Sequence, residues 1–312
     1  MANSEVLVVD RGVSKRDARG SLEGSTRLAM DLLALTKPRI TGLVLLTGAA
    51  GAALAPRRAG FWTLTLAFAG TALIVGAANA LNMWLERDVD ARMSRTKNRP
   101  LPAGRVSPDL ALACGLALAA ASIPMLFAVN VATGSLGLAA LVTYVAIYTP
   151  LKRRTDLALL VGAVPGAIPP VLGWTSETGG IGLGGLLLFG LLFFWQLPHF
   201  AAISIARADD YARANLKVVS TQRGERAARW IVLGWSVLLV VSSLLFVPFG
   251  LAGRRYAAVA GVLALPCLGL AALGLAASAH RDARRWAMRV FRFSIVHLTF
   301  LIVALLCDSA AP

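Results

Sequence analysis

The fold class can be read from residues 62–108, WTLTLAFAGTALIVGAANALNMWLERDVDARMSRTKNRPLPAGRVSP. Residues 62–84 are apolar over a length that lets a helix cross a lipid bilayer. The residues that follow are rich in acids and bases, so charge begins where the apolar helix meets water. Long apolar segments separated by short charged ones predict an all-α, polytopic membrane protein.

The composition of the whole chain supports this prediction. The 312 residues are 57% hydrophobic and 15% charged, whereas a soluble domain carries about a quarter charged residues. The apolar blocks predict about nine transmembrane helices in one bundle around a central cavity. The expected spans are residues 38–55, 62–84, 109–129, 132–149, 157–175, 182–206, 229–249, 256–278 and 290–307.

The distribution of positive charge predicts the orientation of the chain. The net charge is +15, which could suggest a nucleic-acid partner. However, about 27 of the 31 Lys and Arg residues fall in the amino-terminal tail and in alternate loops, and about 4 in the other loops. Such an asymmetry follows the positive-inside rule. We therefore expect no nucleic acid, a cytoplasmic amino terminus, an external carboxyl terminus, and a bacterial inner (plasma) membrane location.

The amino-terminal segment and the cysteines carry less information. Residues 1–28 mix four acids with four Arg and one Lys and lack the apolar core of a signal peptide. We expect a disordered cytoplasmic tail there, followed by an intramembrane domain over residues 29–312. Cys114, Cys267 and Cys307 lie in apolar spans without CxxC spacing, as expected of buried small hydrophobic residues.

A first group of oxygen-bearing side chains ends the span over residues 62–84. Asn82, Glu86 and Asp90 are four residues apart, which places them on one helix face at about 6 Å per step. Hard oxygen ligands beside a basic run suit Mg²⁺ that itself carries a diphosphate. The alternative is a solvated helix end of mixed charge, although an amide as deep as that of Asn82 is costly to expose to lipid.

A second acidic pair, Asp209 and Asp210, follows the span over residues 182–206. Carboxylates at the ends of two helices that face one cavity can hold Mg²⁺ ions against diphosphate oxygens. The metal would neutralise a diphosphate leaving group and favour cleavage of an allylic carbon–oxygen bond. These two groups together predict chemistry on a lipid diphosphate at the membrane surface.

Each of three further features has two possible interpretations. His199 lies about 15 Å deeper than Asp210 and is either an interhelical hydrogen-bonding residue or a contact for a large substrate. Lys152, Arg153 and Arg154 serve topology alone or bind diphosphate. The proline-rich span over residues 157–175 either lines the cavity or is kinked for packing. His297 is expected to pack, and His280 to lie in a loop.

The motifs together resemble the intramembrane prenyltransferase superfamily and, within it, the protohaem IX farnesyltransferases (haem O synthases). The resemblance begins near residue 30, and WQxPHF combined with DDY is typical of the haem branch. The motifs are LTKPRIT (35–41), NMWLERDVDARMSRTKNRPLPAG (82–104), YTPLKRRT (148–155), WQLPHFAAISIARADDYAR (195–213) and RWAMRVFRFSI (285–295).

The resemblance implies a reaction and a set of site residues. Farnesyl diphosphate would ionise, a vinyl group of haem B would attack the farnesyl cation, and water would complete haem O for a terminal oxidase. The implied Mg²⁺ ligands, also the catalytic set, are Asn82, Glu86, Asp90, Asp209 and Asp210. The implied substrate contacts are Arg95, Lys97, Arg99, Lys152 and Tyr211 near the diphosphate and His199 at the haem.

Some points depart from this family pattern or stay open. Glu86 stands where the family usually has aspartate, and residues 214–225 differ from the family's loop. The sequence leaves open whether a haem A synthase is a partner. One alternative function is prenylation of an aromatic quinone precursor, and another, from a different class, is cation-coupled transport.

Overall fold

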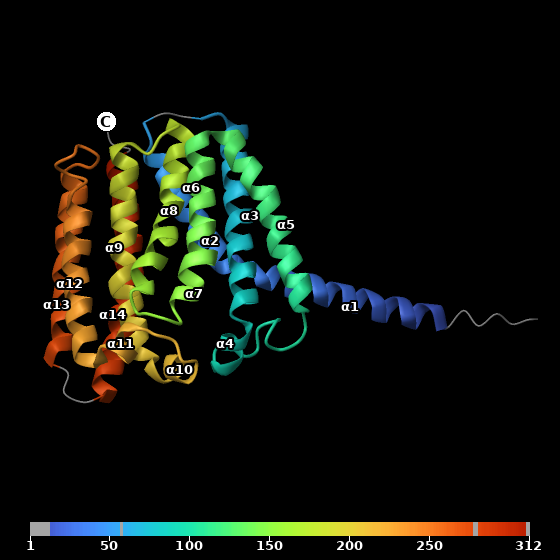
Figure 1. Ribbon diagram of the computed structural model, residues 1–312. Coiled ribbons are helices and arrows are strands. Elements are labelled where there is room, and N and C mark those ends of the chain that lie inside the picture. Colours follow the sequence, from blue (N-terminus) through green and yellow to red (C-terminus); the bar gives the residue numbers. More distant parts are fainter. Residues whose placement is uncertain (1–12, 57–58, 277–279, 310–312) are drawn as a thin grey trace, which may run out of the picture.

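The computed structural model describes residues 13–56, 59–276 and 280–309 (Figure 1). All regular elements within these ranges are helical, which confirms the all-α prediction. The longer helices are α1 (Val13–Leu35), α2 (Pro38–Leu54), α3 (Phe61–Leu85), α5 (Pro108–Val129), α6 (Val131–Val142), α8 (Ala158–Thr178), α9 (Gly182–Ala206), α12 (Gly224–Leu244), α13 (Arg254–Leu273) and α14 (His280–Ser309). The short ones are α4 (Arg87–Arg92), the π-helix η1 (Thr143–Tyr148), α7 (Thr149–Leu151), α10 (Ala208–Arg213), α11 (Val219–Gln222) and the 3₁₀ helix η2 (Gly274–Ala276).

The described residues contain eight helical segments long and apolar enough to cross a membrane. A ninth is obtained if residues 24–35 of α1 and all of α2, which meet at a bend of 46°, count as one broken span. This number agrees with the polytopic bundle expected from the sequence. The chain is thus a multi-pass membrane protein.

Several helices are longer than their apolar cores. α12 begins at Gly224 and α14 at His280, before the expected span starts of residues 229 and 290. The added residues are rich in Arg and Ala, which favour helix, and the Arg side chains can remain in the polar zone outside the hydrocarbon. Hydropathy therefore located the spans but not the helix ends.

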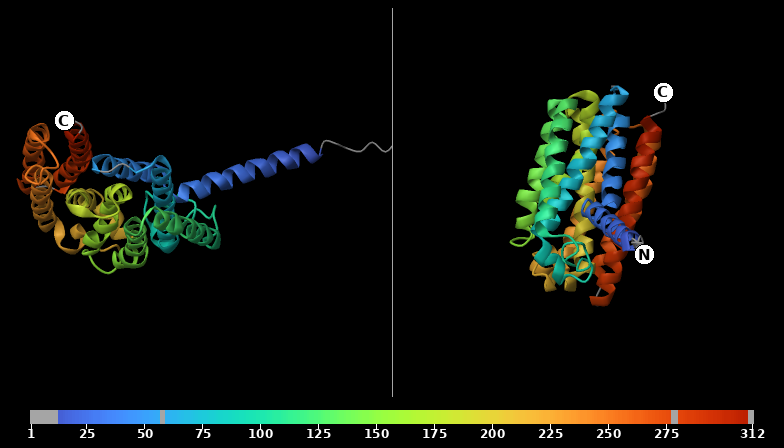
Figure 2. Two further views of the ribbon diagram at one scale, coloured as in Figure 1. Left: turned by 90° about the horizontal axis from the view of Figure 1, so that it is seen from above. Right: turned by 90° about the vertical axis from the view of Figure 1, so that its right-hand side faces the viewer.

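The amino-terminal region also differs from expectation. Residues 1–12 lie outside the described residues. Residues 13–28, expected to be disordered, form the first part of α1, which leads away from the bundle (Figure 2). Extending an existing helix costs far less than nucleating one, so α1 can continue outward from its packed end. The proposed boundary at residue 28 stays a prediction.

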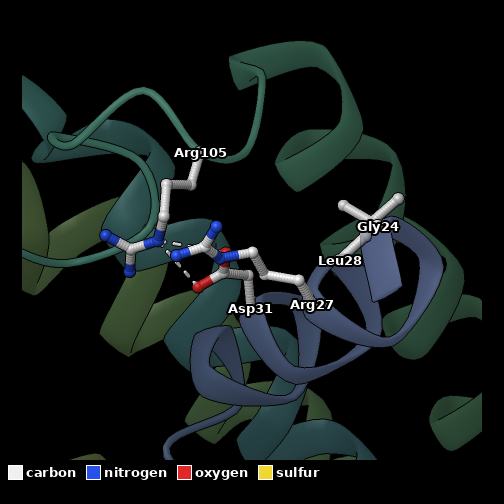
Figure 3. A pocket seen from close by; sticks show the side chains of 5 residues that line it. All are labelled: Gly24, Arg27, Leu28, Asp31 and Arg105. Atoms are coloured by element: carbon white, nitrogen blue, oxygen red, sulfur yellow. Dashed lines mark hydrogen bonds and ion pairs between the residues drawn. The ribbon is translucent and has the colours of Figure 1, made fainter. Parts of the chain in front are cut away.

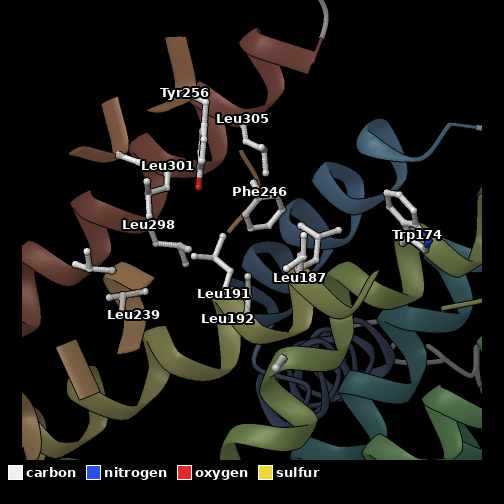
Figure 4. Close-up of a cluster of buried hydrophobic side chains, with 14 of the residues drawn as sticks. Trp174, Leu187, Leu191, Leu192, Leu239, Phe246, Tyr256, Leu298, Leu301 and Leu305 are labelled. Atoms are coloured by element: carbon white, nitrogen blue, oxygen red, sulfur yellow. The ribbon is translucent and has the colours of Figure 1, made fainter. Parts of the chain in front are cut away.

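The helix α9 lies at the centre of the largest apolar core. It packs against α8, α12 and α14. Leu191 on α9, Tyr256 on α13 and Leu301 on α14 are fully buried there (Figure 4). This core fixes α9 and α14 against each other, and both helices carry residues of the candidate site.

The proline-rich helix α8 packs very closely on α2. A Cβ atom on Gly51 would lie 1.9 Å from the carbonyl oxygen of Pro170, and one on Gly173 would lie 1.8 Å from that of Gly48. Small residues at such positions allow backbones to touch, as in other membrane helix pairs. The structure thus gives α8 a packing role, and its lining of a central cavity stays a prediction.

The short helices α4, α10 and α11 gather at one end of the bundle (Figure 1). We call this the acidic end, because α4 and α10 carry the predicted acidic residues. α14 finishes at the opposite end (Figure 1).

Candidate active site

The first acidic group forms where α3 ends. Glu86 has a non-helical backbone (φ −105°, ψ 10°) and separates α3 from α4. The amide of Asp90 nevertheless donates to the Glu86 carbonyl oxygen at 2.8 Å, so the helical spacing survives the bend. Asn82, Glu86 and Asp90 are all buried. The expected face of oxygen ligands is therefore present, on a bent helix rather than a straight one.

Asn82 is oriented by two hydrogen-bond acceptors. Its Nδ2 donates to Glu86 Oε2 at 2.9 Å and to Thr149 Oγ1 at 3.0 Å. Thr149 Oγ1 in turn donates its single proton to the Tyr144 carbonyl oxygen at 2.7 Å, so it can only accept from Asn82. Both amide protons are thereby used, and Oδ1 is the atom of Asn82 that remains for a ligand.

The π-helix η1 helps to place these groups. A π-helical turn shifts the hydrogen-bonding pattern of the backbone, and such turns are frequent at functional sites. The short helix α7 follows η1 and ends just before Lys152. Lys152 Nζ lies 2.6 Å from Glu86 Oε2 and 5.1 Å from the ring centre of Tyr148. The basic patch is thus divided: Lys152 joins the acidic site, whereas Arg153 pairs with Asp88 at 2.7 Å on the outside.

Asp90 is held by the loop that follows α4. Arg99 Nη1 lies 2.7 Å from Asp90 Oδ2, and Thr96 Oγ1 donates to the Asp90 carbonyl oxygen at 2.8 Å. Arg99 therefore lies beside the acids, as expected. Arg95 and Lys97 on the same loop are exposed and make no ion pair among the described residues.

The second acidic group meets the first through a serine. Ser94 Oγ donates to Asp210 Oδ1 at 2.8 Å, and Arg213 pairs with the same carboxylate. The hydrogen bond from Ser94, followed by that from Arg213, lowers the pKa of Asp210. Asp210 is buried although it lies beyond the end of α9. The two segments that carry the predicted acidic residues therefore meet at the acidic end, through Ser94 and Asp210.

Asp209 does not join this arrangement. Its side chain is 62% exposed, and its Oδ1 lies 2.5 Å from Arg284 on α14. Neighbouring residues of a helix point about 100° apart, so only one of the two aspartates can face the first group. The structure assigns the inward position to Asp210, and a metal-ligand role for Asp209 stays a prediction.

Tyr211 packs between the two acidic segments. It lies against the apolar cluster of Val89, Met93, Ala214 and Leu216. Burial raises the pKa of the Tyr211 phenol, and the nearby Tyr148 raises it further. Tyr211 therefore stays protonated at neutral pH and can donate a hydrogen bond.

The donor set fits Mg²⁺ shared with a substrate. Among the described residues, no three His, Cys, Asp or Glu side chains gather closely enough to hold a metal by themselves. Glu86 Oε1 is buried, and no hydrogen-bond partner for it occurs in the described part of the chain. Carboxylate and amide oxygens with coordination positions left for diphosphate are suited to Mg²⁺. Glu86, Asp90, Asp210 and Asn82 would hold it.

His199 lies deeper in α9, beside α14. Its Nδ1 lies 2.7 Å from Ser294 Oγ, and Trp195 Nε1 donates to the Ser294 carbonyl oxygen at 2.7 Å. The interhelical hydrogen bond expected as one interpretation is therefore present. Two of the motifs quoted above, residues 195–213 and 285–295, meet at this serine. By contrast His297 is buried, with its ring centroid 5.7 Å from that of Phe293, in agreement with its expected packing role.

Sequence reasoning missed several residues at the site. Ser94, Thr149 and Ser294 are small hydroxyl residues whose importance depends on distant partners. Lys37 lies within electrostatic range of Glu86, Asp90, Arg99 and Lys152. Lys37 has a left-handed backbone (φ 49°) at the bend between α1 and α2. Its place within the motif LTKPRIT was the available signal.

Two surface hollows lie outside the acidic site. One, of about 340 Å³, lies between α1 and the loop before α5, where both carboxylate oxygens of Asp31 accept from Arg105 Nε at 3.0 Å (Figure 3). The other, of about 320 Å³, lies between α13 and α14 beside Trp286 and Arg289. Neither is the expected central cavity, which stays a prediction.

Solved structures with a similar fold support the architecture. A digeranylgeranylglyceryl phosphate synthase superposes with a TM-score of 0.78 at 13% identity, covering 91% of this chain and 99% of its own. A UbiA homologue from Archaeoglobus fulgidus, bound to GPP and Mg²⁺, gives a TM-score of 0.61 at 18% identity, covering 87% and 99%. This chain therefore has the same helix-bundle fold as these two membrane proteins.

Sequence comparisons are more specific. The model of the UbiA prenyltransferase family matches residues 44–296. Proteins named Protoheme IX farnesyltransferase are 52% identical in Anaeromyxobacter sp. (strain Fw109-5), covering 90% of this chain and 94% of theirs, and 54% identical in Sorangium cellulosum (strain So ce56), covering 78% and 86%. The chain belongs to the UbiA prenyltransferase family. The resemblance read from the motifs is thereby confirmed.

Proposed function

We propose that this protein transfers a farnesyl group from farnesyl diphosphate to a vinyl group of protohaem IX (haem B), with addition of water, to give haem O. The observation that carries the proposal is the meeting of two charged helix ends through Ser94 and Asp210. The names of its relatives, at 52% and 54% identity, support haem as the acceptor.

The residues of the acidic end are suited to the diphosphate. Lys152 and Arg99 each lie within 2.7 Å of a carboxylate and carry positive charge at the same place. Lys37 is a further basic side chain nearby, within electrostatic range of both. These side chains can donate hydrogen bonds to diphosphate oxygens and stabilise the negative charge that grows on the leaving group. Tyr211 can donate a further hydrogen bond.

The acids serve the metal. When bound, Mg²⁺ would neutralise the diphosphate and make it a better leaving group. Asn82 presents its Oδ1 because both of its amide protons are already used. Glu86 has one carboxylate oxygen beside Lys152 and the other without a partner among the described residues. The residues thus hold the leaving group end of the substrate in a fixed orientation.

The deep part of the bundle is suited to an acceptor with apolar faces. His199 lies between the rings of Trp195 and Phe291, at centroid distances of 4.8 and 4.4 Å. A small hydroxybenzoate or naphthoate acceptor contains no metal ion and so does not need an imidazole partner such as His199, which favours haem over a quinone precursor. A cation-coupled transporter would place its acids near the bilayer midplane, whereas these lie at one end of the bundle.

The orientation and setting of the protein form part of the proposal. The acidic end would face the cytoplasm, because most Lys and Arg lie in its loops and tail. The membrane would be the bacterial inner membrane. A haem A synthase that consumes the product stays a prediction as a partner.

The test is prenyl transfer by the purified protein in lipid nanodiscs. Farnesyl diphosphate, Mg²⁺ and haem B should give haem O, identified by chromatography and mass spectrometry. Chelation of Mg²⁺ should stop the reaction, and 4-hydroxybenzoate should give no product. Formation of prenylated hydroxybenzoate without haem O would overturn the choice of acceptor.

A further inference from the structure

Ser294 has a hydrogen-bonding pattern that determines the protonation of His199. Ser294 Oγ donates to the carbonyl oxygen of Phe291, one turn earlier on α14, at 2.8 Å. A serine hydroxyl has only one proton to donate. With that proton directed at the Phe291 carbonyl oxygen, Ser294 Oγ acts as the acceptor toward His199 Nδ1 at 2.7 Å. Nδ1 then carries a proton.

The rest of the environment keeps the imidazole neutral. His199 is buried, and its ring contacts are the aromatic rings of Trp195, Phe291 and Phe200. The hydrogen-bond partner is a hydroxyl group rather than a carboxylate. A charged imidazole at membrane depth would be costly in these surroundings. With Nδ1 protonated and the ring neutral, Nε2 carries a lone pair.

The ring is also held in one orientation. It lies between Trp195 at 4.8 Å and Phe291 at 4.4 Å, while Phe200 meets its edge at 5.4 Å. Trp195 is itself tied to the Ser294 carbonyl oxygen. Nε2 has no hydrogen-bond partner among the described residues, and it is not one of their fully enclosed unpartnered atoms. Nε2 is therefore the atom open to an incoming molecule.

We infer that Ser294 is a positioning residue that fixes the Nδ1-protonated tautomer of His199, so that Nε2 binds the iron of the haem acceptor as an axial ligand. This rests on the proposed function, because it assumes a haem substrate. A neutral imidazole nitrogen is a common ligand of haem iron. A hydrogen bond at the other ring nitrogen usually fixes the tautomer of such a ligand.

The inference explains why residues 95 positions apart form one unit. His199 comes from α9 and Ser294 from α14. His199 also lies eleven residues before Asp210 on the chain, or about 16 Å along the helix axis. Haem would thus be held well away from the diphosphate charges, in the apolar part of the bundle.

The experiment measures binding of ferric haem B to the full-length protein in nanodiscs. Absorption and electron paramagnetic resonance spectra should show an imidazole-ligated iron in the wild type. His199→Ala should lose this signature, and added imidazole should restore it. Ser294→Ala should weaken haem binding by about tenfold or more, whereas Ser294→Thr, which keeps the hydroxyl, should bind nearly as the wild type does.

Controls separate this inference from the proposed function. His297→Ala removes another buried histidine of α14 and should leave the haem spectrum unchanged. Size-exclusion chromatography identifies the variants that are folded. These variants should all bind farnesyl diphosphate as the wild type does. An unchanged spectrum in His199→Ala, or unchanged haem affinity in Ser294→Ala, would overturn the inference even if the wild type makes haem O. Absence of haem O from the wild type would overturn the proposed function instead.

Discussion

Replacement of Thr149 by valine tests whether the orientation of Asn82 matters for the metal. Valine has nearly the same shape as threonine but lacks the hydroxyl that accepts from Asn82 at 3.0 Å and donates to the Tyr144 carbonyl oxygen at 2.7 Å. The substitution leaves the Asn82 amide free to turn over. It would then present Nδ2, a donor, where Oδ1 is proposed to face the metal.

The size of the effect follows from the two lost hydrogen bonds. A buried polar group left without its partner costs about 1–3 kcal/mol. If this cost falls on the transition state, kcat/KM decreases by about 5- to 150-fold, since about 1.4 kcal/mol corresponds to a factor of ten. The Mg²⁺ concentration needed for half-maximal rate should increase as well, because Asn82 Oδ1, a proposed metal ligand, would no longer be held in place.

The assay is farnesyl transfer by the purified variants at several Mg²⁺ concentrations. Thr149→Ser keeps the hydroxyl and should retain most of the activity. Thr47→Val is a matched control, because the Thr47 hydroxyl, in the middle of α2, bonds within the described part of the chain only to the Val44 carbonyl oxygen. A wild-type Mg²⁺ dependence in Thr149→Val would refute the reasoning, as would an equal loss in Thr149→Ser.

Three further predictions concern the acidic end and the packing. Asp210→Ala should reduce haem O formation at least about 100-fold, measured by chromatography, whereas Asp209→Ala should lose less than about tenfold; equal losses would contradict the assigned orientation of the pair. Ser94→Ala should move the acid limb of the pH–rate profile to higher pH. The hydrogen bond from Ser94 stabilises the ionised Asp210 carboxylate and lowers its pKa below the ordinary 3.8. This stabilisation of the folded protein is complete above pH 3.8 and is lost as the pH falls through the lowered pKa, so removing Ser94 lets Asp210 take up its proton at a higher pH. An acid limb that does not move would exclude this role. Gly51→Val should lower the thermal midpoint of the protein by several degrees, since its side chain would overlap the Pro170 carbonyl, and an unchanged midpoint would contradict the close packing of α2 on α8.

The sequence was sufficient for the elements that depend on local pattern. Apolar runs located the spans, and the spacing of Asn82, Glu86 and Asp90 located the first acidic group. The choice between Asp209 and Asp210 was not accessible, because it depends on where α9 ends and how α10 turns. Helix ends at Gly224 and His280 were missed because charged residues continue a helix that apolar residues began.

Long-range pairings could not be predicted for a different reason. Ser294 is one of many serines in apolar helices, and only the packing of α14 on α9 brings it to His199. Lys37 approaches the acids because the chain bends at its left-handed backbone. A single sequence contains the residues of such contacts but not the geometry that selects them.

The link between α9 and α14 also bears on the order in which the protein becomes competent during synthesis. The proposed metal ligands Asn82, Glu86, Asp90 and Asp210, with Lys152 and Arg99, are all present once the ribosome has passed Arg213. Ser294, however, belongs to α14, which emerges after the other described helices, so His199 and Trp195 lack their hydrogen-bond acceptor in every nascent chain that ends before it. Synthesis thus completes the proposed farnesyl diphosphate site first. A chain that stops before α14 lacks Ser294 and therefore has an incomplete site for the proposed haem substrate.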